Sequence, residues 1–289
     1  MEVLPATPGQ FEAIYPLLLE FANPRMSRDD WCRMLFDLPW PVDEEERGFV
    51  LRDGGAVVGF LGTIFSRRER NGATHRFCNL SSWIVKETHR AASFQLVLPV
   101  LALKSHTIVN LSPSPAAYEI FARLGFQPLE TAQVLLPPFA RPGELLRTRG
   151  SSVTTRLEEL RAELDEPGRT VAEHMSGTLA AQALVRSGAR RCHVVATRSP
   201  WKGGWKLAHV QYASDWELFW DHQALVSGAF ARTLGTFGLR VEARHLRGRR
   251  PAFSVARPLP RPNLFRPASS DVTPRMIDGL YTEAVGLRW

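Results

Sequence analysis

The sequence predicts an α/β (α+β) protein whose mixed, mostly antiparallel sheet is flanked by helices, with a second α/β domain after it. The first observation is that short extended runs alternate with helical segments through residues 1–130. The second is Asp53-Gly54-Gly55 between two extended runs, a hairpin signal because glycine tolerates positive φ. The third is a helix expected between the runs near Ser81 and Ile108, which requires a right-handed crossover and therefore one parallel pair of strands.

The first half is expected to follow the order β-α-α-β-β-β-α-β-α-β. Phe11, Ile14 and Leu18 recur at helical spacing. Ser27 is a plausible N-cap of the next helix, since two acidic residues follow it and suit the helix dipole. The expected segments are strand 1–7, helices 11–22 and 27–38, the hairpin 48–72, a strand and helix within 79–101, extended 106–114, and helix 115–130 with Pro115 in its first turn and Gly125 at its end.

The second half predicts another domain beyond a linker. Residues 136–155 are rich in Pro, Gly, Ser and Arg, so we expect a first domain at 1–135, this linker, and a second domain at 156–289 with a basic C-terminal part. The order of its elements echoes the middle of the first half, which favours an internal duplication. The expected elements are helices 156–164 and 171–187, strands 192–198 and 206–214, helix 220–238 and strand 239–246.

Composition narrows the function classes. Cys32, Cys78 and Cys192 stand alone, without the spacing of a zinc site or a disulfide framework, so we expect reduced thiols and no metal. No apolar run approaches the length of a membrane span, and we expect a cytoplasmic protein. The formal charge is −2 for residues 1–135 and +9 for the remainder, so an anionic partner is expected to meet the second half.

Two blocks of residues resemble one superfamily. Residues 85–90 run from Val to Arg with four residues between, at the end of an expected strand, and Ala91, Ala92, Ser93, Phe94 and Gln95 follow in a turn before a helix. Farther along stand Ser114, Ala117, Phe121, Gly125 and Phe126. With the order of elements, these blocks make residues 1 to about 133 similar to the GNAT (GCN5-related N-acetyltransferase) superfamily. The whole chain looks like a tandem GNAT-like protein with a degenerate acyl-CoA motif.

The resemblance implies an acyl-CoA site, with acetyl-CoA or another acyl-CoA as the donor. The turn and the helix start would hold the pyrophosphate, and the opening between the parallel strands would admit the pantetheine arm. The residues that the resemblance assigns to this site are Trp83, Ile84, Val85, Arg90, Ala91, Ala92, Ser93, Phe94, Asn110 and Ser114. Ser93 and Gln95 replace both family glycines, at a cost on the order of 1 kcal/mol if either needs positive φ. The Ser93 hydroxyl could instead donate to a phosphate.

The resemblance leaves the catalytic groups open. The position of the family's proton-donating Tyr holds Phe121, and Tyr118, one turn earlier, could replace it or could simply pack at the core edge. Strand alternation predicts that residues 75, 77, 79, 81 and 83 share one face. On that face His75 is a candidate base or a solvated bystander, while Asn79 and Ser81 could position a water or the substrate.

Polar residues also follow the next strand. Asn110, Ser112 and Ser114 lie where ligands bind at the carboxyl end of a parallel strand, and Ser114 before Pro115 also suits a helix cap. Eight arginines between residues 239 and 266 form either a solvated basic surface or a site for an anionic ligand, with nucleic acid disfavoured.

The first hypothesis is an acyltransferase that moves an acyl group from acyl-CoA to a primary amine, which the resemblance to bacterial exopolysaccharide proteins places on an amino sugar. The second is a non-catalytic binding module for a nucleotide, an acyl-CoA or a glycan, favoured by the turn without glycine and by Phe121. The third is an enzyme that takes its acyl group from an acyl carrier protein, like N-acyl amino acid or homoserine lactone synthases.

Overall fold

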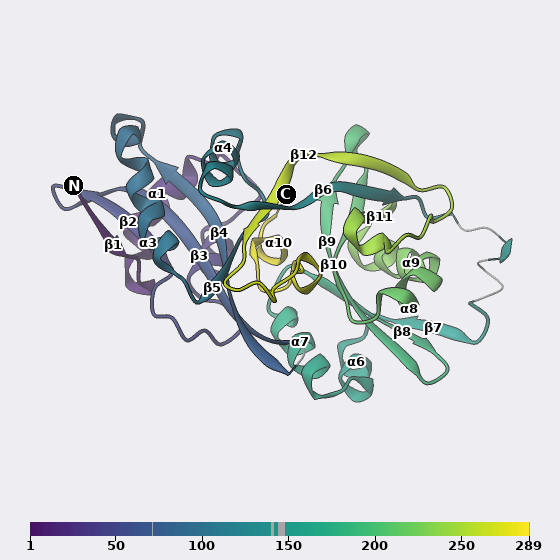
Figure 1. Cartoon of the computed structure of the whole chain (residues 1–289). Coiled ribbons are helices and arrows are strands. Elements are labelled where there is room, and N and C mark those ends of the chain that lie inside the picture. Colours follow the sequence, from purple (N-terminus) through teal and green to yellow (C-terminus); the bar gives the residue numbers. More distant parts are fainter. Residues whose placement is uncertain (71, 140–141, 144–147, 289) are drawn as a thin grey trace. The chain divides into compact units, whose positions relative to one another are not determined.

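The computed structural model describes residues 1–70, 72–139, 142–143 and 148–288, which form two compact units (Figure 1). Unit 1 consists of Met1–Leu129, Arg261–Ile277 and Tyr281–Leu287. Unit 2 consists of Glu130–Pro260, Asp278–Leu280 and Arg288. Within the described residues, no helix is both long and apolar enough to cross a membrane.

Unit 1 has the predicted order of helices and strands. Each expected strand and helix of the first half is present, and two short 3₁₀ helices, η1 and η2, are added. The elements are β1 (Glu2–Pro5), η1 (Pro8–Gln10), α1 (Phe11–Leu19), α2 (Arg28–Leu35), β2 (Gly48–Asp53), β3 (Ala56–Arg70), β4 (Ala73–Val85), η2 (Glu87–Leu96), α3 (Val97–Ala102), β5 (His106–Asn110), α4 (Pro115–Arg123) and the start of β6 (Gln127–Leu136), most of which belongs to unit 2.

The sheet of unit 1 runs in the order β1-β2-β3-β4-β5-β12, where β12 is Val255–Arg266. The neighbours pair antiparallel except β4 and β5, which pair in parallel as the crossover predicted. Residues 264–266 of β12 pair with 108–110 of β5, which places this late segment in unit 1. The expected second domain at 156–289 therefore needs correction, since backbone pairing is decided by sheet geometry and not by sequence order.

A β-bulge in β4 separates the side chains that alternation placed on one face. Ser81 pairs with Gly62 and Ile84 pairs with Phe60, so two residues of β4 oppose one of β3. Ser82 takes a φ of 57° at this bulge. Because the extra residue shifts the alternation, Trp83 packs with the cluster of Cys78 and Leu80, and not beside Asn79 and Ser81. The expected common face for Trp83 is wrong for this reason.

Different elements cover the two faces of the sheet in unit 1. Side chains from η2, α3 and α4 pack with Leu80 and Phe121 in one buried cluster. On the other face, α2 contributes Leu35, which lies against Gly62, and Met34, which lies against Gly286. The segment 281–287 therefore lies on the same side of β4 as the side chains of Asn79 and Ser81.

The turn after β4 is a 3₁₀ helix and not the start of a long α-helix. None of residues 87–96 has a positive φ, and α3 contains six residues. Ser93 and Gln95 therefore cause no backbone strain, and the expected cost of replacing glycine does not arise. The same geometry directs the backbone N–H groups of the interior residues to carbonyls three positions earlier.

The strands of unit 2 run in the order β7-β8-β9-β10-β11-β6. Its elements are β7 (Ser151–Thr154), α6 (Leu157–Glu163), α7 (Glu166–Ser176), β8 (Ala181–Ser187), β9 (Arg190–Pro200), η3 (Lys202–Gly204), β10 (Lys206–Ala213), α8 (Trp216–Asp221), α9 (Gln223–Leu234), β11 (Gly238–Glu242) and η4 (Ala243–Leu246). The short helices η5 (Pro274–Met276) and α10 (Glu283–Gly286) belong to unit 1.

Several predictions in the second half differ from the structure. The predicted helix 220–238 is divided into α8 and α9 and ends at Leu234, and the predicted strand 239–246 ends at Glu242, where η4 follows. Helix 171–187 ends at Ser176, and the polar and apolar alternation of 181–187 forms β8 instead. The expected linker 136–155 holds the end of β6 and all of β7, while its residues 140–141 and 144–147 lie outside the described residues.

The strand order of unit 2 repeats that of unit 1. In unit 1 the order read from β1, and in unit 2 the order read from β7, begins with five strands that follow the chain, and the fourth and fifth of these strands pair in parallel. The fourth strand carries a bulge in each case, at Ser82 in β4 and at Gln211 in β10. The strand beside the fifth one comes from a distant part of the sequence in both units: β12 beside β5 and β6 beside β11.

Candidate functional site

The site lies where β4 and β5 of unit 1 diverge. Their parallel pairing covers residues 76–79 of β4 and 106–109 of β5. Beyond Asn79, β4 continues to Val85 along β3, whereas β5 ends at Asn110. The edge of β4 from Leu80 to Val85 therefore has no strand partner on the β5 side among the described residues. A strand edge of this kind can pair with the amides of an extended ligand.

Glu283 occupies the mouth of this divergence. The Ser112 hydroxyl, just beyond β5, donates to Glu283 Oε1 at 2.5 Å. The Ser81 hydroxyl, at the bulge of β4, also bonds to the carboxylate. One carboxylate thus bridges the ends of the two strands that separate.

Burial sets the proton affinity of this carboxylate. The side chain of Glu283 is 2 % exposed, and burial raises the pKa of its carboxyl, while the hydroxyls of Ser112 and Ser81 lower it in part. Ser112 is exposed to solvent, so its hydroxyl connects the buried carboxylate with the surface. A buried carboxylate with a raised pKa that lies next to an open edge is suited to accept a proton from a substrate.

Asn79 fixes the position of Glu283. The Asn79 Oδ1 accepts the backbone N–H of Glu283 at 2.8 Å, and its Nδ2 donates to Val109 O at 3.4 Å. On the adjacent turn, the Thr282 hydroxyl accepts the N–H of Ala284 at 3.2 Å and caps α10. Tyr281 packs edge-on against Trp40, with their ring centroids 5.2 Å apart. These contacts hold a segment that is distant in sequence against β4.

The structure brings together Asn79 and Ser81 among the predicted catalytic residues. His75 lies before the parallel pairing begins, at the opposite end from the divergence. Asn79 stands four positions after His75, and at the rise of a strand the two residues are about 13 Å apart along β4. His75 is half-buried and is therefore not assembled with Asn79 and Ser81.

Tyr118 and Phe121 lie on the other face of β4. Phe121 is buried, with its ring centroid 5.6 Å from that of Trp83 and 4.9 Å from that of Phe126. Tyr118 is half-buried and packs against the same cluster. Both residues therefore belong to the buried core between α4 and β4, on the face of β4 opposite to Asn79 and Ser81.

The residues predicted to bind the donor follow the open edge and the turn. Trp83, Ile84 and Val85 are half-buried, and the indole N–H of Trp83 is buried without a hydrogen-bond partner in the part of the chain that the structure describes. In η2, Arg90 is exposed and pairs with Glu87 at 2.7 Å. Neighbouring residues of the turn differ in exposure: Ala91 and Phe94 are exposed, Ser93 is half-buried and Ala92 is buried.

The edge and the turn differ in how well they suit a coenzyme A group. The unpaired edge of β4 can accommodate an extended chain that carries amides. In the turn, the phosphates would meet the side chains of Arg90 and Ser93, since the backbone N–H groups inside a 3₁₀ helix are already bonded.

Two polar residues after β5 have structural contacts. Asn110 is buried and pairs with Leu264 of β12. The Ser114 hydroxyl accepts the N–H of Ala117 at 3.2 Å, which makes Ser114 the predicted N-cap of α4. Ser112, which lies between them, is the residue of this group that reaches Glu283.

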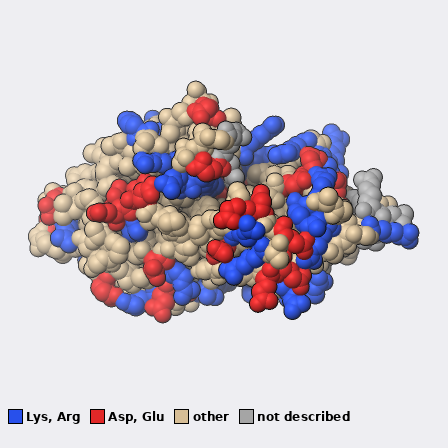
Figure 2. Space-filling model, turned by 90° about the horizontal axis from the view of Figure 1, so that it is seen from below, with Lys and Arg blue, Asp and Glu red and all other residues tan. Residues whose placement is uncertain are grey.

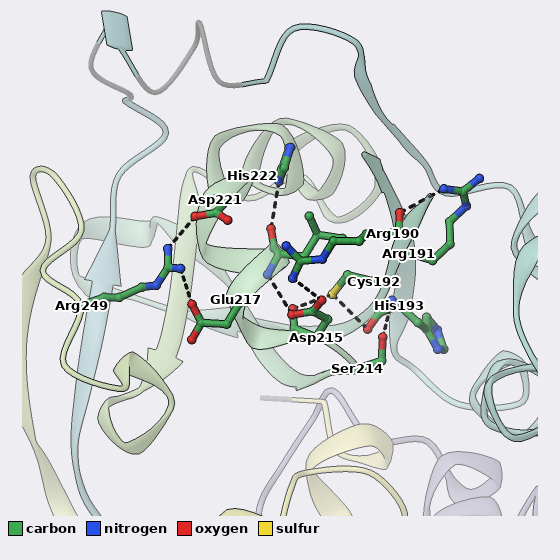
Figure 3. Close-up of polar contacts among 11 residues, drawn as sticks. Arg190, Arg191, Cys192, His193, Ser214, Asp215, Glu217, Asp221, His222 and Arg249 are labelled. Carbon is green, nitrogen blue, oxygen red and sulfur yellow. Dashed lines mark hydrogen bonds and ion pairs between the residues drawn. The ribbon is translucent and has the colours of Figure 1, made fainter. Parts of the chain in front are cut away.

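The equivalent position in unit 2 is closed by a local network, shown in Figure 3. Asp215, the N-cap of α8, accepts the N–H of Leu218 at 3.0 Å and pairs with Arg190 at 2.6 Å. The Cys192 thiol donates to Asp215 O at 3.2 Å, and burial raises its pKa to about 11. A carboxylate at the start of α8 repels a phosphate, so this position is unsuited to a second acyl-CoA.

Half of the eight arginines predicted to form a basic surface have internal partners. Arg240 donates to Ser199 Oγ, Arg244 pairs with Glu242, Arg249 pairs with Glu217 and Asp221, and Arg266 donates to Leu101 O. Arg247, Arg250, Arg257 and Arg261 are exposed. Acidic and basic side chains are interspersed over the face drawn in Figure 2. Ion pairing of Arg244 and Arg249 therefore offsets part of the positive charge expected from the sequence.

Comparison with known proteins identifies structural neighbours. No protein-family model matches the chain. No curated protein matches it in sequence. A GCN5-related N-acetyltransferase from Anabaena variabilis is similar with a TM-score of 0.58 and 10% identity, over 93% of this chain and 73% of that chain. One from Kribbella flavida has a TM-score of 0.57 and 14% identity, over 92% and 70% of the two chains. A probable N-acyltransferase from Enterococcus faecalis has a TM-score of 0.54 and 10% identity, over 92% and 72%.

Proposed function

The chain has the GNAT fold, and we propose that it is an acyltransferase that moves an acyl group from acyl-CoA to a primary amine in unit 1. One observation carries this proposal: the Glu283 carboxylate lies between Ser81 and Ser112, at the point where β4 and β5 diverge. A donor thioester lying along the open edge of β4 would bring its carbonyl carbon near this carboxylate.

The proposed reaction uses the residues of unit 1 as follows. An acceptor amine attacks the thioester carbonyl, the C–N bond forms, the C–S bond breaks and CoA leaves as a thiolate. Glu283 accepts the proton that the amine loses, and its raised pKa makes it a stronger base than an exposed glutamate. Ser112 and Asn79 hold the carboxylate in place, so that positioning supplies part of the rate.

A buried carboxylate also favours a cationic acceptor. An ammonium group entering beside Glu283 would offset the cost of burying the negative charge. We propose an amine on an amino sugar as the acceptor to test first, with amino acids and polyamines as comparisons, because all three present a primary amine.

Calorimetric titration with acetyl-CoA, a longer acyl-CoA and CoA tests donor binding without knowledge of the acceptor. Ser93→Glu places a negative charge in the turn and is expected to weaken binding at least tenfold, because like charges in a binding site cost several kcal/mol. Ser93→Gln is the matched control, since it has the same size without the charge. Equal affinities of the two variants would contradict the placement of the phosphates at this turn.

A second candidate, a non-catalytic binding module, is favoured by the 3₁₀ turn and by the buried Phe121 in place of a proton donor. Donor binding without release of thiol, with every amine tested, would support this candidate over the enzyme. Transfer from an acyl carrier protein, with no binding of any acyl-CoA, would support a carrier-dependent enzyme instead.

We also propose that the two units arose by duplication of one GNAT-like domain. The repeated strand order, the parallel pair in each sheet and the bulge in each fourth strand support this. In this proposal the acyl-CoA site is kept in unit 1, while Asp215 blocks the equivalent position in unit 2.

A further inference from the structure

Three exposed aromatic rings form a cluster in unit 2. Phe139, Trp205 and Phe237 are 59%, 55% and 41% exposed. The centroid of Phe237 lies 4.5 Å from that of Trp205 and 6.3 Å from that of Phe139. Apolar side chains that gather in the open, and are not scattered singly, indicate a surface that contacts another body. We call these three residues the aromatic cluster.

The backbone beneath the aromatic cluster is ordered by hydrogen bonds. The Trp201 N–H donates to Trp205 O at 2.7 Å and closes the turn between β9 and β10. The Phe237 N–H donates to Lys206 O at 2.8 Å and holds the residue before β11 beside that turn. The rings of Trp205 and Phe237 are therefore held in an exposed arrangement by the ends of the strands.

The segments that supply the rings contain no acidic residue, and two of the three contain basic residues. Residues 131–139, 194–214 and 222–241 contain no Asp or Glu. Arg198, Lys202 and Lys206 are exposed beside the turn that carries Trp205. The aromatic cluster thus lies next to three cations, so its charge complements an anionic surface.

The chemistry of these groups favours a lipid surface over the other anionic partners. A sugar platform needs polar groups that bond to hydroxyls, and two of the three rings are phenylalanines. The rings are also tilted, with interplanar angles of 48° and 85°. Lysine is depleted in protein interfaces, whereas lysine and arginine both contribute to binding at anionic membranes. Aromatic rings beside basic residues are the pattern of a segment that lies in the membrane interface.

We propose that the aromatic cluster, with Arg198, Lys202 and Lys206, docks unit 2 onto an anionic membrane surface. The rings enter the headgroup region and the cations contact the lipid phosphates. This binding is peripheral and does not depend on the proposed acyl transfer in unit 1. A vesicle-binding measurement therefore tests it separately from the acyltransferase proposal.

Co-sedimentation of the full chain with lipid vesicles tests the proposal. Vesicles of phosphatidylcholine alone are compared with vesicles of phosphatidylcholine and phosphatidylglycerol. We expect binding to the anionic vesicles, with loss at about 1 M salt, where the Debye length falls to about 3 Å. Bound protein should also show a blue shift of tryptophan emission, because Trp205 leaves water.

Variants separate the contributions of the rings and the charges. Lys202→Gln with Lys206→Gln should weaken binding about 25-fold, since each lysine contributes on the order of a fivefold gain at an anionic surface. Trp205→Ala with Phe237→Ala should abolish the emission shift. Matched controls are Lys104→Gln with Arg123→Gln, both exposed in unit 1, and Phe21→Ala, whose ring is also 41% exposed and lies 5.9 Å from that of Trp31.

Each outcome decides the proposal. Weaker vesicle binding by the two unit 2 variants, with normal binding by the control variants, would support the proposed membrane docking. Absence of binding to anionic vesicles, or equal binding by the unit 2 variants and the controls, would overturn it. Stronger retention on an acidic protein or an acidic glycan than on the vesicles would also overturn it. Circular dichroism of each variant would show whether any loss reflects unfolding.

Discussion

Glu283→Gln should lower the rate of acyl transfer while leaving the geometry of the site in place. Glutamine has the size of glutamate, and its Oε1 can still accept the hydrogen bond that Ser112 donates at 2.5 Å. Its backbone N–H can still reach Asn79, because that contact does not involve the side chain. The variant therefore loses only the ability to accept a proton at this position.

The expected loss in kcat/KM follows from this single change. General acid and base groups contribute about 10² to 10⁴ in rate, so at least a 100-fold decrease is expected. A 100-fold decrease corresponds to about 2.7 kcal/mol in the activation free energy. The affinity for the donor should change little, because glutamine keeps the size and the hydrogen-bonding oxygen of Glu283 and the carboxylate does not contact the turn that would hold the phosphates.

The assay measures thiol release from acyl-CoA in the presence of the amine that the wild-type chain uses. Glu119→Gln is the matched control, since Glu119 is an exposed glutamate on α4 of the same unit. The wild-type chain should lose kcat/KM as the pH falls and Glu283 becomes protonated, which is the acidic limb of its pH profile. Glu283→Gln should lack this acidic limb. A variant with the wild-type rate and an unchanged profile would refute the assignment of Glu283 as the base.

The same site and unit 2 provide three further predictions. Ser112→Ala removes a hydrogen bond that lowers the pKa of Glu283, so the acidic limb of the kcat/KM profile should move to higher pH; an unmoved limb would show that Ser112 does not act on the reacting carboxylate. Since the raised pKa of Glu283 means that the folded chain holds this proton more tightly than the unfolded chain, folding stability is lost as pH rises through the raised pKa. Glu283→Gln should therefore melt near the wild-type temperature below the ordinary glutamate pKa of 4.5 and above it at neutral pH; a gain confined to acidic pH would contradict this sign. Gly279→Ala would bring a Cβ into overlap with the side chain of Gln211 and should destabilise unit 2 by about 1–3 kcal/mol in a denaturant titration, whereas Gly143→Ala, with open space around it and no positive φ, tests the cost of a glycine substitution alone.

Much of unit 1 could be predicted because its signals are local. The hairpin at Asp53-Gly54-Gly55, the cap at Ser27 and the cap at Ser114 depend on residues within a few positions of each other, and all three are present. Asn79 and Ser81 were predicted as polar residues on one face, and this holds because the alternation is regular up to Ser81.

The remainder depends on features without a local signal. Ser82 is neither glycine nor proline, so the sequence did not mark the bulge that turns Trp83 to the other face. Glu283 is separated by 204 positions from the Asn79 side chain that holds it, and no motif links the two. Its position in a short acidic and apolar stretch could have marked it only as a helix residue.

The place of β12 has a consequence for how the protein is made. During synthesis, residues 1–129 leave the ribosome well before residues 261–287, which complete the sheet of unit 1 and deliver its carboxylate. Contacts of such large sequence separation form slowly, because a long loop must close first. Unit 1 therefore stays without its proposed base until unit 2 has been translated. A recombinant fragment of the first 129 residues would lack Glu283, so the two halves of the gene cannot be expressed separately to recover the proposed activity.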